Sequence, residues 1–330
     1  MSDATGLGHL FATVGEESTD LIGSVVAAAK DHLAADISFL AEFEGGQKLI
    51  RRAAGDGASC GLVEGTALPL EETYCFRMVN GELPNVVGDA RNDPRVKDLA
   101  ITTQLKIGAY IGVPVTLPGG RVFGTLCCIS HQQDSSIRDR DAKFMRVLAD
   151  LVAKQLGREE MVADERQKKI ERIRAVIEQG GARMVFQPIV ALAGGAIVGA
   201  ESLARFDAEP RRTPDLWFAE AWQVGLGVEL EVMAMKAAIA RLAEIPQGVY
   251  LSVNASPETL RSETLLRSFD AAPAERIVVE VTEHAIVDEY GPLVEAIRRL
   301  KDRGIRLAVD DVGAGYSRSE ERRVGKECRL

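Results

Sequence analysis

The segment IVVEVTEH at residues 277–284 decides the fold of the C-terminal half, because a short apolar run ends there in acidic side chains. Comparable apolar runs occur at Met184–Val190, Ile197–Leu203, Val249–Val253 and Arg306–Val309. Stretches with helical spacing, such as Leu216–Leu242 and Leu293–Arg303, lie between them. Alternation of strands with helices predicts an α/β barrel or a doubly wound sheet.

Side chains with oxygen ligands recur at the ends of these runs. In a parallel α/β barrel the carboxyl ends of the strands meet on one face, where active sites form. Carboxylates gathered there would repel one another unless cations were bound, and oxygen ligands suit Mg²⁺ or Mn²⁺. A lone acid is more often a solvated residue or a helix cap, so the repetition carries the prediction. The residues are Glu201, Asn254, Glu280, Glu283, Asp310 and Asp311.

Five motifs give this pattern a family resemblance. They are FQPIV at 186–190, GAESLARF at 199–206, SVNASPETL at 252–260, VVEVTEH at 278–284 and DDVGAGYS at 310–317. In order and spacing they resemble EAL domains, which hydrolyse cyclic-di-GMP to pGpG with two divalent metals. The resemblance implies that residues 181–317 form the N-terminal portion of a TIM-like (β/α)₈ barrel.

The resemblance also implies roles for individual residues. Glu201, Asp310 and Asp311 would be catalytic, Gln187 and Arg205 would contact the guanine and phosphate regions of the substrate, and Glu283 would fix a loop. Ser202 stands where the family has Ala, and Val312 where it has Phe. Glu201, Asn254, Glu280 and Asp310 would hold one Mg²⁺ or Mn²⁺, and Asp310 with Asp311 the second.

Residues 318–328, RSEERRVGKEC, do not continue the strand and helix pattern. They match the in-frame translation of a common short-read sequencing adapter, so we expect residues 318–330 to be an artefact. The family's later lysine and glutamate would then be missing. We therefore expect the intact gene product to be the phosphodiesterase and the truncated chain to be inactive. The alternative is a non-catalytic cyclic-di-GMP receptor gated by the N-terminal domain.

The N-terminal half predicts one α/β unit, with a core at about residues 15–157. The motifs are ETYCFRMVNGELPNVVGDARNDPRV at 72–96, IGAYIGVPVTLPGGRVFGTLCCIS at 107–130 and DRDAKFMRVLADLVAKQL at 139–156. They resemble GAF domains, small-molecule or redox sensors that often dimerise through flanking helices. The resemblance implies a sensor domain at 1–157 with an unknown ligand. Pocket candidates are Tyr74, Cys75, Arg91, Tyr110 and Cys127, although core packing explains each of them equally well.

Residues 158–180 predict a connecting helix that is dense in charge. Ile170, Ile173 and Ile177 suit a short parallel coiled coil in a homodimer, but a solvated linker helix fits equally well because the heptads are few.

Composition limits the function classes. The net charge of −9 argues against a mainly electrostatic binder of nucleic-acid polymers or membranes. The five cysteines show no metal-ligand spacing, which indicates free thiols in a reducing cytoplasm. Cys127 and Cys128 are adjacent, so a strand would point them to opposite faces. We expect no signal peptide, and no apolar run reaches the roughly 18 residues of a membrane span.

Overall fold

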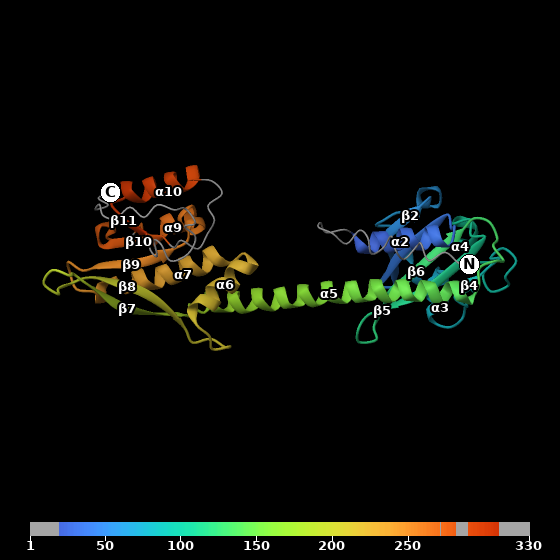
Figure 1. The fold of residues 1–330 in the computed structure, drawn as a ribbon, viewed down its shortest axis with the longest axis horizontal. Helices are drawn as coiled ribbons and strands as arrows, with labels where there is room; N and C mark the ends of the chain where they lie inside the picture. The colour runs from blue at the N-terminus through green and yellow to red at the C-terminus, as the bar shows by residue number, and fades with distance from the viewer. Residues whose placement is uncertain (1–19, 271, 282–289, 310–330) are drawn as a thin grey trace, which may run out of the picture. The chain divides into compact units, whose positions relative to one another are not determined.

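The computed structural model describes residues 20–270, 272–281 and 290–309 (Figure 1). The chain divides into two compact units, unit 1 at Met1–Ala163 and unit 2 at Asp164–Leu330. The helix α5, Asp139–Glu178, crosses this division as one continuous element of 40 residues. The motif at 139–156 and the predicted connecting helix at 158–180 therefore lie in one helix, which ends at Glu178.

Unit 1 is built on an antiparallel sheet of six strands in the order β3-β2-β1-β6-β5-β4. Two hairpins with glycine turns, β1–β2 and β5–β6, form its four long strands. The strands are β1 (Ile37–Glu44), β2 (Gln47–Gly55), β3 (Ala67–Pro69), β4 (Val86–Val87), β5 (Ala109–Thr116) and β6 (Val122–Ser130).

Helices cover both faces of this sheet, and the alternation of side chains along each strand supplies two cores. On one face, α2 (Leu21–His32) and α5 pack against residues such as Leu126 and Cys128. On the other face, α3 (Tyr74–Val79) and α4 (Ala100–Gln104) pack against residues such as Phe39 and Cys127. Cys127 and Cys128 thus lie in different cores, as the sequence predicts.

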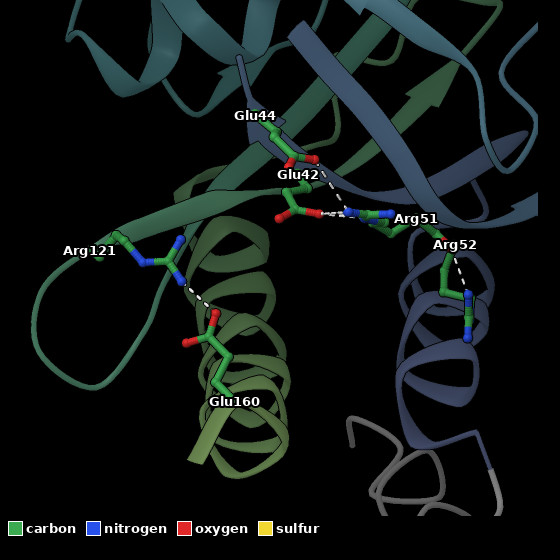
Figure 2. Close-up of polar contacts among 6 residues, drawn as sticks. All are labelled: Glu42, Glu44, Arg51, Arg52, Arg121 and Glu160. Carbon is green, nitrogen blue, oxygen red and sulfur yellow. Dashed lines mark hydrogen bonds and ion pairs between the residues drawn. The ribbon is translucent and has the colours of Figure 1, made fainter. Parts of the chain in front are cut away.

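Ion pairs at the surface of unit 1 join neighbouring elements (Figure 2). Arg121, in the turn between β5 and β6, lies 2.5 Å from Glu160 of α5, and both side chains are more than half exposed. Arg51 of β2 pairs with Glu42 and Glu44 of β1. Water screens such pairs, so they add little to stability.

Unit 2 contains a five-stranded sheet in the order β11-β10-β9-β8-β7 over its described residues. The four strands β8 to β11 are parallel, and the first strand, β7, is antiparallel to β8. The apolar run at Met184–Val190 is therefore a strand, but it pairs antiparallel with its neighbour, unlike the strands of a regular (β/α)₈ barrel. The strands are β7 (Ala182–Val190), β8 (Ile197–Phe206), β9 (Tyr250–Ala255), β10 (Ile277–Val281) and β11 (Arg306–Val309).

The antiparallel start of the sheet has a local cause. Gly194 and Gly195 both adopt positive φ, at 91° and 70°, in the short loop between β7 and β8. The loop closes with a hydrogen bond from the Ala191 amide to the Ala196 carbonyl of 2.9 Å. Glycine reaches these dihedral angles without a steric penalty, so the chain reverses here as a hairpin.

The helices of unit 2 pack on one face of the sheet around residues such as Leu251, Val253 and Val279. The predicted helix at Leu216–Leu242 is two helices, because Gly225 adopts φ 83° and ends the first. The helices are α6 (Pro214–Val224), α7 (Gly227–Ala240), α8 (Pro257–Leu260), α9 (Glu263–Ser268), α10 (Tyr290–Asp302) and the C-terminal part of α5. No helix in the described part of the chain is long and apolar enough to cross a bilayer.

Candidate functional site

Polar side chains of three neighbouring parallel strands share the sheet face that lies opposite the helices of unit 2. On β8, Ser202, Ala204 and Phe206 are buried, so alternation places Glu201 and Arg205 on the other face. Strand register sets Glu201 beside Ser252 of β9, and Asn254 beside Glu280 of β10. The four side chains therefore form one polar patch.

Hydrogen bonds connect this patch. Asn254 Nδ2 donates to Glu201 Oε1 at 3.3 Å, and Ser252 Oγ donates to Glu280 Oε1 at 2.5 Å. Asn254 Oδ1 is buried and accepts no hydrogen bond from the described residues. A buried acceptor without a donor costs free energy, so a cation or a ligand donor is the expected partner of this oxygen.

The donor set fits a hard divalent cation. Glu201 and Glu280 offer carboxylate oxygens, and Oδ1 of Asn254, which has no donor in the described part of the chain, offers a carbonyl oxygen between them in register. Within the ranges that the structure describes, no group of three His, Cys, Asp or Glu side chains gathers closely enough to hold a metal. The predicted ligands Asp310 and Asp311, and the predicted loop residue Glu283, lie outside the described residues.

The two predicted substrate contacts lie beside this patch. Gln187 of β7 is exposed and stands directly opposite Glu201 in the β7–β8 register, so both side chains share a face. Arg205 is half-buried and donates from Nη1 to the Ala204 carbonyl at 2.7 Å. No carboxylate of the described residues forms an ion pair with Arg205, which leaves its guanidinium charge for an anionic ligand.

A cavity of about 590 Å³ opens at the carboxyl ends of β8 and β9, within the size range of ligand sites. Arg205 and Asn254 reach it from the strands, and α6 and α7 close it with apolar side chains. The sequence interpretation missed the α6 and α8 contributions, because helix periodicity does not show which residues face a cavity. Further lining residues include Asp215, Phe218, Trp222, Met235 and Glu258.

Glu231 of α7 holds the turn after Asn254. Its carboxylate accepts hydrogen bonds from the Ser256 amide at 2.9 Å, from the Ser256 hydroxyl at 3.0 Å and from Trp222 Nε1 at 3.2 Å. Burial raises the pKa of Glu231. The residue therefore supports the cavity wall by fixing the chain that follows β9.

Glu220 of α6 connects this helix to α5. Its carboxylate accepts from Arg172 of α5 at 2.8 Å and from Arg212 at 2.7 Å, and its side chain is only 8% exposed. Burial alone would raise the pKa of Glu220, but the two arginines hold it at about 2. The Arg212 guanidinium also stacks over the Trp217 ring at 4.0 Å. The C-terminal part of α5 is thus fixed to a helix that lines the cavity.

Four of the five pocket candidates in unit 1 come together in one core. The Tyr74 and Tyr110 rings are 5.2 Å apart, and the sulfurs of Cys75 and Cys127 are 3.5 Å apart. The fifth candidate, Arg91, is exposed and donates to the His131 carbonyl at 2.9 Å. The four buried residues pack as a core, and Arg91 lies at the surface.

Comparisons with known proteins divide the chain in the same way. The model of the GAF domain matches residues 18–156, and the model of the EAL domain matches residues 170–322. A GAF domain from an Acinetobacter phosphoenolpyruvate-protein phosphotransferase matches with 16% identity and a TM-score of 0.40, over 50% of this chain and 99% of that one.

Curated relatives match the second half of the chain. The cyclic di-GMP phosphodiesterase RocR of Pseudomonas aeruginosa is 30% identical over 162 residues, which cover 43% of this chain and 39% of the relative. The probable cyclic di-GMP phosphodiesterase PdeB of Escherichia coli is 31% identical over 161 residues, covering 44% and 30%. The matches thus span less than half the length of either relative.

Proposed function

Because the chain carries a GAF domain followed by an EAL domain, we propose that its gene product is a cyclic-di-GMP phosphodiesterase that forms pGpG. The observation that carries the proposal is the patch of Glu201, Asn254 and Glu280 on adjacent parallel strands, with a buried acceptor that has no donor among the described residues. The relatives that match this half include a named cyclic di-GMP phosphodiesterase.

The residues of the patch suit phosphodiester hydrolysis. Two bound Mg²⁺ or Mn²⁺ ions would supply an activated water and offset the charge that develops in an in-line displacement. Glu201, Asn254 and Glu280 would hold one of these ions, together with Asp310, and Asp310 and Asp311 would hold the second. Arg205 would donate to a phosphate of the substrate with its planar guanidinium, and Gln187 would contact a guanine edge.

We also propose that the GAF domain gates this activity through α5. Arg172 of α5 holds Glu220 on one side of α6, while Asp215, Phe218 and Trp222 of the same helix line the cavity. A displacement of α5 would therefore move a wall of the cavity. The proposal includes a cytoplasmic homodimer, a small-molecule signal at the GAF domain, and neither a nucleic-acid polymer nor a membrane as partner.

The test measures hydrolysis of cyclic-di-GMP by the full-length gene product with Mg²⁺ or Mn²⁺, with pGpG separated by chromatography. Glu201→Gln should abolish turnover without unfolding the protein. Glu244→Gln is the matched control, because Glu244 lies in the same unit in an exposed pair with Arg241. Binding without hydrolysis in the wild type would favour the receptor alternative, and neither binding nor hydrolysis would refute both functions.

A further inference from the structure

Two cysteines from distant parts of the sequence meet in the core of unit 1. Cys75 of α3 and Cys127 of β6 have sulfurs 3.5 Å apart, and the side chains are 1% and 0% exposed. Tyr110 Oη lies 3.4 Å from the Cys127 sulfur and 3.9 Å from the Cys75 sulfur. A disulfide bond is about 2.05 Å long, so the two sulfurs are separate thiols. A small movement of one sulfur toward the other would allow a disulfide to form.

The surroundings of the pair include a buried cation. Lys48 of β2 is 2% exposed, and its amino group lies 4.3 Å from the centre of the Phe39 ring. No carboxylate in the described ranges forms an ion pair with Lys48. Burying an ammonium group without a counter-charge is costly, so an anion in this core would be stabilised strongly.

The two sulfurs differ in acidity. The pKa of the Cys75 thiol is well below its ordinary value, first because Cys127 hydrogen-bonds to it and further because the Lys48 charge acts on it; burial opposes both. Burial holds the pKa of Cys127 well above its ordinary value. One acidic thiol beside one that keeps its proton is the arrangement of a nucleophile with a resolving partner.

A third buried cysteine provides an internal contrast. Cys128 follows Cys127 directly but lies in the core on the other face of the sheet, at 1% exposure. Burial raises the pKa of Cys128 to about 12. Cys128 therefore remains a protonated thiol. It is buried on the same strand as Cys127, but it lies on the opposite face of the sheet from Cys75.

We propose that Cys75 and Cys127 are a reversible redox site in unit 1, oxidised by hydroperoxides to an intramolecular disulfide. With hydrogen peroxide, the Cys75 thiolate attacks one oxygen, the O–O bond breaks, and the hydroxide that leaves takes a proton from solvent to become water. The Cys127 thiol then attacks the sulfur of the resulting sulfenic acid and expels the second water. Two thiols lose two electrons, the peroxide gains them, and an external dithiol reverses the change.

Access to the pair depends on α3. This helix has only six residues and itself carries Cys75 into the core, so local opening of α3 would admit a peroxide to the pair. The disulfide would tie α3 to β6 and raise the unfolding temperature of unit 1, since it would join two positions 52 residues apart. The proposal depends on unit 1 alone and is independent of the phosphodiesterase activity.

The experiment treats the full chain with hydrogen peroxide, denatures it, blocks free thiols with N-ethylmaleimide and maps peptides without reduction. The expected result is a Cys75–Cys127 linkage that dithiothreitol removes. Cys128→Ser should retain this linkage, whereas Cys75→Ser and Cys127→Ser should lose it. If either serine variant fails to fold, the wild-type peptide map still decides. Oxidation at other thiols with no Cys75–Cys127 linkage would overturn the proposal.

Lys48→Met tests the role of the buried charge. At a pH below the Cys75 pKa, raising that pKa by one unit lowers the thiolate fraction about tenfold. The rate of the first step falls by the same factor, because the thiolate is the attacking species. We expect the Cys75–Cys127 disulfide to form at least several-fold more slowly in Lys48→Met than in the wild type. The rate in the variant should increase again as the pH rises. An unchanged rate in a folded variant would show that Lys48 has only a structural role.

Discussion

Replacing Glu220 by Gln removes the negative charge that two arginines share. In the native structure its carboxylate accepts hydrogen bonds from Arg172 and Arg212, and the amide of Gln keeps the shape but not the charge. Two guanidinium groups would then lie close together with no counter-charge between them. The substitution should therefore destabilise unit 2 and loosen the contact between α5 and α6.

The pKa of Glu220 sets the size of this effect. The arginines hold it at about 2 against an ordinary value of 4.5, and one pH unit corresponds to about 1.4 kcal/mol. The full difference of about 2.5 pH units is about 3.5 kcal/mol. The Glu220 side chain is 8% exposed, but those of Arg172 and Arg212 are 31% and 16% exposed, so solvent reduces the figure, and we expect a loss of about 2–3 kcal/mol at pH 7.

Unfolding in urea followed by tryptophan fluorescence isolates this effect. The chain has two tryptophans, Trp217 and Trp222, and both lie in α6, so the signal reports unit 2 alone. Glu244→Gln, which breaks an exposed pair in the same unit, is the control and should leave the midpoint almost unchanged.

The pH dependence gives the prediction a second check. Because the folded pKa is depressed, the stabilisation by Glu220 is complete above the unfolded value of 4.5 and is lost as pH falls toward about 2. The difference between the wild type and Glu220→Gln should shrink over that window. A variant as stable as the Glu244→Gln control at pH 7, or a difference that does not change between pH 5 and pH 2, would refute the reasoning.

Four further substitutions test the fold and the site. Leu251→Ala removes a fully buried side chain of β9 and should cost unit 2 about 2–5 kcal/mol in the same urea assay. Arg121→Ala breaks the exposed pair with Glu160 and should change the thermal stability of unit 1 by less than about 1 kcal/mol (Figure 2). Gly124→Ala would place a methyl group 1.9 Å from the Ala41 carbonyl oxygen, and circular dichroism should show a much lower unfolding temperature. Arg205→Lys would lose the proposed two-pronged phosphate contact and should raise KM for cyclic-di-GMP about tenfold, with a smaller change in kcat.

Much of the fold could be predicted because strands in this chain are short apolar runs bounded by glycine or charge. The runs at Ile277–Val281 and Arg306–Val309 are strands with those bounds. The direction of β7 could not be predicted from the run itself, because direction depends on the loop that follows. The glycine pair at Gly194 and Gly195 is the signal that would have indicated a hairpin.

The part of the candidate site that lies on the strands could be predicted, because the two-residue period of a strand decides which side chains share a face. Glu201, Asn254 and Glu280 are the described members of the predicted metal set, and strand register brings them to one patch. Ser252 was missed, although it lies two residues before Asn254 and so on the same face. The Arg172–Glu220–Arg212 contact had no sequence signal, because three separate segments form it only after packing.

The cysteine pair shows where sequence reasoning stops for a physical reason. Strand alternation separates Cys127 from Cys128, but it does not show which face will receive a second thiol. That choice is made by α3, which packs Cys75 onto the Cys127 side. Cys127→Ser should therefore abolish the linkage even though Cys128 remains one residue away, because the sheet lies between Cys128 and Cys75. A Cys75–Cys128 linkage in that variant would mean that β6 shifts register during oxidation, and the structural basis of the redox pair would fail.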